Sequence, residues 1–280
     1  MIRRFLPILI IFIGLVGCRK EAATDKPIVT VSIEPLRWAA ERLAGDKMEV
    51  HSLLGRGGNP ENYEPAFSHL TSLEHSRVYM TVGNLGFEDA IRRRVEANNP
   101  DLRIVCTSDS IELIHATHGS QDHGADPHVW SSAANMRVMA RNMLHVLCEI
   151  DPKNADTYQR NYERLAAHID SVNAVCDSII APMRGSTFVV WHPSLSYFAR
   201  DYGLTQLSVG AEGKEHSVGE TKELLDRVKE TGAQVFLIQK DFDPSQARTL
   251  ARELRTIVID PMNYEWDTEM LHTARSIAGQ

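Results

Sequence analysis

The sequence predicts two similar α/β lobes joined by one long helix. Short runs of β-branched residues alternate with amphipathic stretches in the first part of the chain, and the same alternation returns in the last part. Between them lies a polar, strongly helical stretch. About 260 residues remain after the N-terminal leader, which is enough for two lobes of ordinary domain size.

Eight strands are expected, four in each lobe. Residues 27–149 should form the N-terminal lobe, with strands at Ile28–Ile33, Val50–Leu54, Val78–Val82 and Ile104–Thr107. Residues 183–280 should form the C-terminal lobe, with strands at Thr187–Trp191, Gln206–Val209, Val235–Gln239 and Thr256–Ile259. Each run is followed by a turn or a helical pattern, as parallel sheets require.

Residues 150–182 are expected to be the linking helix. Asp151-Pro152 interrupts the helical pattern once, and Asp151 is placed to cap the helix that Pro152 opens. No glycine or proline follows until Pro182. A helix of about 28 residues would be roughly 40 Å long, which suits a strut that spans both lobes.

The N-terminus reads as an export signal. Residues 1–17 contain two arginines followed by an apolar run that is shorter than the roughly 20 residues of a spanning helix. Leu15-Val16-Gly17-Cys18 resembles the lipobox of bacterial lipoproteins, which implies that Cys18 is lipidated and that residues 18–26 are a tether. Ordinary secretion and an uncleaved anchor are the alternatives. The expected location is extracytoplasmic and membrane-anchored.

Composition excludes some classes of partner and of site. The net charge is −7 and acidic and basic residues are interspersed, which argues against a nucleic-acid partner. Beyond Cys18 the cysteines are Cys106, Cys148 and Cys176, without the short paired spacings of a thiolate metal site. At most one disulfide is possible among these three, and its pairing stays open.

Three rigid segments carry candidate metal donors at or near strand ends. They are Asp126-Pro127-His128-Val129-Trp130, Trp191-His192-Pro193 and Ile259-Asp260-Pro261. Proline stiffens the chain beside each donor, and strand ends are where α/β folds place their sites. Imidazole and carboxylate donors suit a first-row divalent cation, and a tetrahedral site needs a fourth ligand.

Together with Gly57-Gly58-Asn59-Pro60-Glu61-Asn62-Tyr63-Glu64-Pro65, these segments resemble the metal-binding solute-binding proteins of ABC transporters, the zinc and manganese family. The resemblance runs from Pro27 to the C-terminus. It implies two α/β lobes joined by a long helix, with the metal in the cleft between them. It also implies a monomer that delivers the metal to an ABC importer permease. By position, the implied ligands are Glu61 and His128 from the first lobe and His192 and Asp260 from the second.

Glu61 departs from the family pattern, which usually has histidine at this position. Two carboxylates make the site harder and favour manganese or iron, whereas the histidine at position 192 is typical of the family's zinc binders. Zinc is the preferred expectation, and manganese or iron is the alternative. If Glu61 is no ligand, water or Glu64 takes its place.

The polar, glycine-containing stretch that begins at His115 is expected to be a flexible loop. His115, His118 and His123 resemble a shortened form of the family's histidine-rich loop and are possible auxiliary metal ligands.

Two other functions compete with metal transport. A membrane-tethered zinc hydrolase would need an open coordination position and a general base, and the sequence has no HExxH helix. A surface adhesin or scaffold would use the metal structurally. We expect a binding protein rather than an enzyme.

Overall fold

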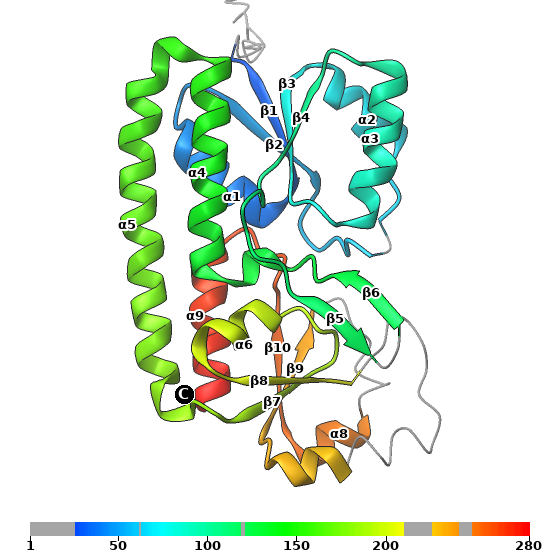
Figure 1. The fold of residues 1–280 in the computed structure, drawn as a ribbon, viewed down its shortest axis with the longest axis vertical. Coiled ribbons are helices and arrows are strands. Elements are labelled where there is room, and N and C mark those ends of the chain that lie inside the picture. The colour runs from blue at the N-terminus through cyan, green and yellow to red at the C-terminus, as the bar shows by residue number, and fades with distance from the viewer. Residues whose placement is uncertain (1–25, 62, 119–120, 210–225, 241–247) are drawn as a thin grey trace, which may run out of the picture.

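The computed structural model describes residues 26–61, 63–118, 121–209, 226–240 and 248–280. Figure 1 shows two lobes stacked along the long axis of the molecule, with two helices, α4 and α5, along one side. We call the part before α5 the N-terminal lobe and the part after it the C-terminal lobe. No helix in the described ranges is long and apolar enough to span a membrane.

The N-terminal lobe is built on a parallel sheet with strand order β2-β1-β3-β4. Its strands are β1 (Ile28–Ile33), β2 (Glu49–Leu54), β3 (Ser76–Thr81) and β4 (Arg103–Cys106). The connecting helices are α1 (Glu34–Ala44), α2 (Phe67–Glu74) and α3 (Gly86–Asn98). The central strand β1 is buried over nearly its whole length, because helices cover both faces of a parallel sheet.

The C-terminal lobe repeats this plan with strand order β10-β9-β7-β8, again all parallel. Its strands are β7 (Thr187–Val190), β8 (Thr205–Ser208), β9 (Val235–Gln239) and β10 (Arg255–Ile259). Its helices include α6 (Ser196–Tyr202), α8 (Arg248–Glu253) and α9 (Trp266–Ala278). Gly203 ends α6 with φ 66°, a left-handed conformation that glycine adopts without strain.

Helices α4 (Ala133–Ile150) and α5 (Ala155–Ile180) join the lobes, with short 3-10 turns at Pro152–Asn154 and Ala181–Met183 on either side of α5. The 26 residues of α5 span roughly 39 Å at 1.5 Å per residue. α5 packs on α4 and α1 and, further along, on α9. Its buried residues, including Leu165, Ile169, Val172 and Cys176, recur every three or four positions.

One hydrophobic core runs through both lobes. It takes in buried side chains of β1 and β3, the facing sides of α4 and α5, and parts of β7 and α9. A smaller core lies on the other face of the C-terminal sheet and includes Val189, Phe236 and Ile238. The shared core means that the lobes are packed together, in addition to being joined by α5.

The expected fold is confirmed: all eight strands occur, with ends within two residues of those predicted. The predicted cap at Asp151 is wrong, because its carboxylate accepts hydrogen bonds from the Asn154 amide and the Tyr158 hydroxyl, each at 2.7 Å, and caps no backbone N–H.

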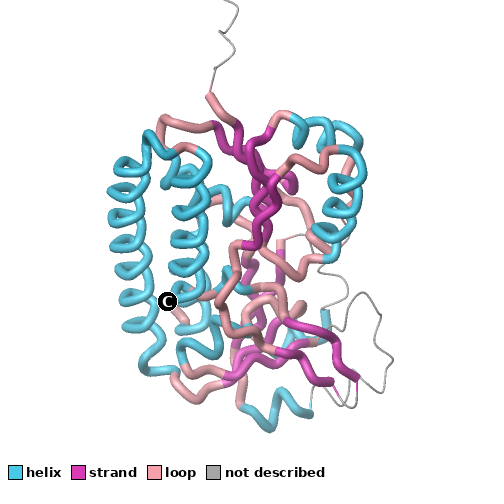
Figure 2. The backbone as a smooth tube through the Cα atoms, turned by 45° about the horizontal axis from the view of Figure 1, so that its top comes forward, coloured by secondary structure: helices cyan, strands magenta, loops and turns pink. Residues whose placement is uncertain are grey.

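The expected loop after His115 contains an antiparallel hairpin, β5 (His115–His118) and β6 (Gln121–Ala125), visible in Figure 2. Cys106, Cys148 and Cys176 are free thiols, so they form no disulfide.

Candidate metal centre

Glu61 lies on the loop between β2 and α2. Its backbone N–H donates to the Asn59 side-chain oxygen at 2.8 Å, which forms a local turn. Two residues later, the Tyr63 hydroxyl donates to the Leu53 carbonyl at 3.0 Å, and its ring packs edge-on against Phe87. These contacts fix the loop at the end of β2, so that Glu61 is presented from the N-terminal lobe.

His128 follows β6 and is almost fully buried. Asp126 accepts hydrogen bonds from the backbone N–H and from Nδ1 of His128, both at 2.9 Å. Burial by itself would raise the pKa of the Asp126 carboxyl, but the hydrogen bonds and charge of His128 hold that pKa below its ordinary value. The ionised carboxylate fixes the proton on Nδ1 and leaves the lone pair of Nε2 for a ligand.

His192 follows β7 in the C-terminal lobe and is held by Gln239, at the end of β9. The Gln239 amide donates to the His192 carbonyl at 3.0 Å and accepts from the His192 backbone N–H at 3.3 Å. It also donates to Ser194 at 2.8 Å. Sequence reasoning missed Gln239, although a polar residue at the end of an otherwise apolar strand was a signal for it. It also missed the part of Asp126 in orienting His128, for which their spacing of two residues was the signal.

The side chains of Glu61, His128 and His192 meet between the lobes. His192 Nε2 lies 3.2 Å from His128 Nε2 and 3.0 Å from Glu61 Oε1. The two imidazole rings have centroids 4.9 Å apart and are inclined by 70°. Three of the four predicted ligands therefore lie together, with their donor atoms in contact through His192.

Asp260, the fourth, stands at the end of β10 apart from this contact. Its Oδ2 lies 3.7 Å from Lys240 Nζ, and its backbone N–H donates to Glu269 at 2.8 Å. Its loop does contact the segment that carries His128, because Trp130 Nε1 donates to the Pro261 carbonyl at 2.8 Å. In the part of the chain that is described, no three His, Cys, Asp or Glu side chains are already arranged to enclose a metal ion.

Residues 29–277 match the family model described as zinc-uptake complex component A, periplasmic. The chain belongs to this family. A crystal structure of ZnuA is 30% identical in sequence, with a TM-score of 0.84, and the match covers 91% of this chain and 99% of that one. A second ZnuA structure, a deletion mutant with zinc bound, is also 30% identical, with a TM-score of 0.83, and the match covers 91% of this chain and 97% of that one. The manganese ABC transporter substrate-binding lipoprotein PsaA of Streptococcus pneumoniae is 24% identical over 86% of this chain and 82% of its own length.

Membership in the zinc-uptake component A family confirms the resemblance read from the sequence, and the ZnuA structures confirm the two-lobe fold. The further histidines are only partly described. His115 is exposed on β5, and the side chains of His118 and His123 lie outside the described residues. Cys18 also lies outside them.

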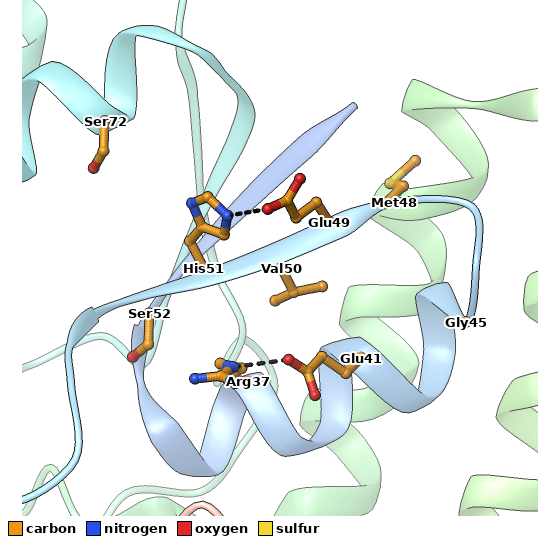
Figure 3. A pocket seen from close by; sticks show the side chains of 9 residues that line it. All are labelled: Arg37, Glu41, Gly45, Met48, Glu49, Val50, His51, Ser52 and Ser72. Carbon is orange, nitrogen blue, oxygen red and sulfur yellow. Dashed lines mark hydrogen bonds and ion pairs between the residues drawn. The ribbon is translucent and has the colours of Figure 1, made fainter. Parts of the chain in front are cut away.

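A pocket of about 790 Å³ lies elsewhere on this family member, on the N-terminal lobe (Figure 3). Its charged and imidazole side chains are paired with one another: Arg37 with Glu41 at 2.8 Å, and His51 with Glu49 at 2.9 Å. None of the four predicted ligands lines it. The donor atoms between the lobes, and not this pocket, therefore define the candidate metal centre.

Burial and the neighbouring His128 lower the pKa of His192 to about 3. His192 is thus neutral at pH 7, as a metal ligand must be. An unfolded chain takes up this proton near pH 6.5. Between that value and pH 3 the unfolded state binds the extra proton, so stability falls as the pH falls.

The expected result is that the parent loses about 2 kcal/mol more unfolding free energy between pH 7 and pH 4.5 than the His192→Asn variant does. Urea unfolding of both proteins at the two pH values, without added metal, measures this difference. Equal losses would show that His192 titrates normally in the folded protein.

Proposed function

We propose that this chain captures a divalent metal, zinc in preference to manganese, and delivers it to the permease of an ABC importer. The family description names zinc uptake, and one of the similar solved structures is a ZnuA with zinc bound. Because PsaA carries manganese in its name, family membership leaves the metal open. The choice of zinc rests on the donor atoms of this chain.

The spacing of three donor atoms is the observation that carries the proposal. A tetrahedral zinc ion with bonds of about 2.0 to 2.1 Å holds its ligand atoms roughly 3.3 Å apart. The His128–His192 and His192–Glu61 separations of 3.2 and 3.0 Å are close to that edge length. Both separations would need to change by only a few tenths of an ångström to match a zinc site.

Two imidazoles favour zinc over manganese, because nitrogen donors suit zinc and manganese stands lowest in the affinity order of divalent first-row ions. The two carboxylates would balance the charge of the cation. Asp260 is the proposed fourth ligand. Its side chain would rotate away from Lys240 so that the carboxylate could bind the metal instead. With four protein ligands the site has no open position for water, which supports a carrier over a hydrolase. PsaA, likewise, is named a substrate-binding protein.

A metal titration of the chain from Arg19 onward tests the proposal. We expect one equivalent of zinc per chain after purification in trace metal, and a zinc affinity at least tenfold above that for manganese. Elemental analysis and competition with a chelating dye supply both values. A higher affinity for manganese than for zinc would overturn the choice of metal, and a chain that retains no metal would overturn the proposed function.

The proposed lipid anchor is Cys18. The Cys18→Ser variant should carry no acyl label and should be released from membranes on fractionation, since the leader Phe5–Val16 is too short to hold it there. Equal retention of variant and parent, with no label on either, would remove the anchor from this account.

A further inference from the structure

The segment from Asp260 to Trp266, which links β10 to α9, is bonded to the opposite lobe. Trp130, two residues after His128, donates its indole N–H to the Pro261 carbonyl at 2.8 Å. Trp266 donates in return to the Trp130 carbonyl at 2.7 Å. Both tryptophans are buried, with exposures of 1% and 3%. The two hydrogen bonds close a ring between the His128 loop and the Asp260 segment.

A third contact joins the same segment to α1, which it approaches in Figure 1. The Tyr264 hydroxyl donates to Glu41 Oε2 at 2.6 Å. The guanidinium groups of Arg37 and Arg56 lie over the Tyr264 ring, 5.0 and 5.2 Å from its centroid. Arg56 stands in the loop that leads from β2 to Glu61, so that the segment contacts that loop too.

Within its own lobe, the Asp260 carboxylate is held only weakly among the contacts described for it. Its contact there is the 3.7 Å ion pair with Lys240, whose side chain is 70% exposed. Exposed pairs of this kind contribute little. The Asp260 backbone is held in its own lobe by Glu269, and the two indole hydrogen bonds tie the segment to the His128 loop across the lobes.

We propose that Trp130 and Trp266 are positioning residues for the metal, which set the separation of His128 and Asp260 across the two lobes. This inference rests on the proposed metal function. A loop that already holds its ligand residue in place loses little conformational entropy when the metal binds. The metal affinity of the site therefore depends on the contacts that hold this loop. Loss of the Trp266 indole N–H leaves the buried Trp130 carbonyl without its donor, and loss of the Trp130 indole N–H removes the bond to the half-buried Pro261 carbonyl.

Trp38 offers a matched control. It is fully buried and packs on Trp266, with ring centroids 4.9 Å apart. Its indole N–H is buried without a hydrogen-bond partner in the described part of the chain. Trp38→Phe thus removes the same volume from the same cluster and breaks no hydrogen bond.

The test compares zinc affinity in Trp130→Phe, Trp266→Phe and Trp38→Phe, each checked for folding by circular dichroism. We expect losses of about tenfold or more for the first two and less than about threefold for the control. Equal losses in all three would mean that the tryptophans act only by packing, and would overturn the proposal.

Repeating Trp130→Phe in an Asp260→Asn background isolates the positioning effect. There the tryptophan substitution should cost less than about threefold, because the ligand it positions is already gone. A full tenfold cost in that background, or an Asp260→Asn protein that binds zinc as tightly as the parent, would overturn the positioning role while the metal function stands. A parent that binds no zinc would overturn both.

Discussion

Alanine at position 128 or 192 is expected to lower zinc affinity by about 100-fold or more, because each substitution removes one of the nitrogen donors and leaves a gap that water fills poorly. His128→Ala should also remove the ring hydrogen bond to the Asp126 carboxylate, which keeps only the bond from the backbone N–H of residue 128. His192→Ala removes the side chain that touches both other donors. We expect it to be the more damaging of the two.

Competition titration with a chelating dye measures these losses. His272→Ala is the control, since this exposed histidine of α9 hydrogen-bonds to the Val258 carbonyl of β10 and, among the contacts described for it, to none of the four proposed ligands. It should bind zinc like the parent. A His192→Ala protein with parental affinity would exclude His192 as a ligand.

Substitutions at Glu61 should change which metal is preferred as well as how tightly it is held. Glu61→Ala removes a charged oxygen donor 3.0 Å from His192 Nε2 and should weaken zinc and manganese by about tenfold or more each. Glu61→His supplies a third nitrogen and removes a negative charge. It should raise the preference for zinc over manganese, because nitrogen is the softer donor.

Paired zinc and manganese titrations of the parent and both variants, at one pH, separate the two effects. If Glu61→Ala retained parental zinc affinity, the third donor would be water or a neighbour such as Glu64. With water in that place the site would have an open position, and the hydrolase interpretation would have to be considered again.

The fold was predictable because its signals are local. The strands are short β-branched runs, and those of the sheet centres, such as β1 and β9, are apolar enough to be buried on both faces. The long helix followed from the absence of glycine and proline between Pro152 and Pro182. The hairpin β5–β6 was missed because its residues are polar and carry no apolar alternation. Its strands are held by backbone pairing, which side-chain patterns do not reveal.

The candidate site was predictable only in part. Proline-flanked donors at strand ends pointed to His128 and His192, and the family resemblance added Glu61. That the two histidines touch, 64 residues apart in sequence, depends on how the lobes pack. The partners that orient them, Asp126 and Gln239, and the tryptophans that join the loops act through one or two hydrogen bonds each, for which the sequence offers no periodic signal. The ion pair of Asp260 with Lys240 was likewise beyond reach, because it joins the ends of two strands whose neighbourhood is set by sheet order.

The most direct measurement is a crystal structure of the zinc-loaded chain, with the ion located by its anomalous scattering. We expect zinc at about 2.0 to 2.2 Å from Nε2 of His128, Nε2 of His192 and a carboxylate oxygen each of Glu61 and Asp260, with Lys240 displaced from Asp260. A zinc ion bound elsewhere, with both imidazoles more than about 4 Å away, would contradict the proposed metal centre.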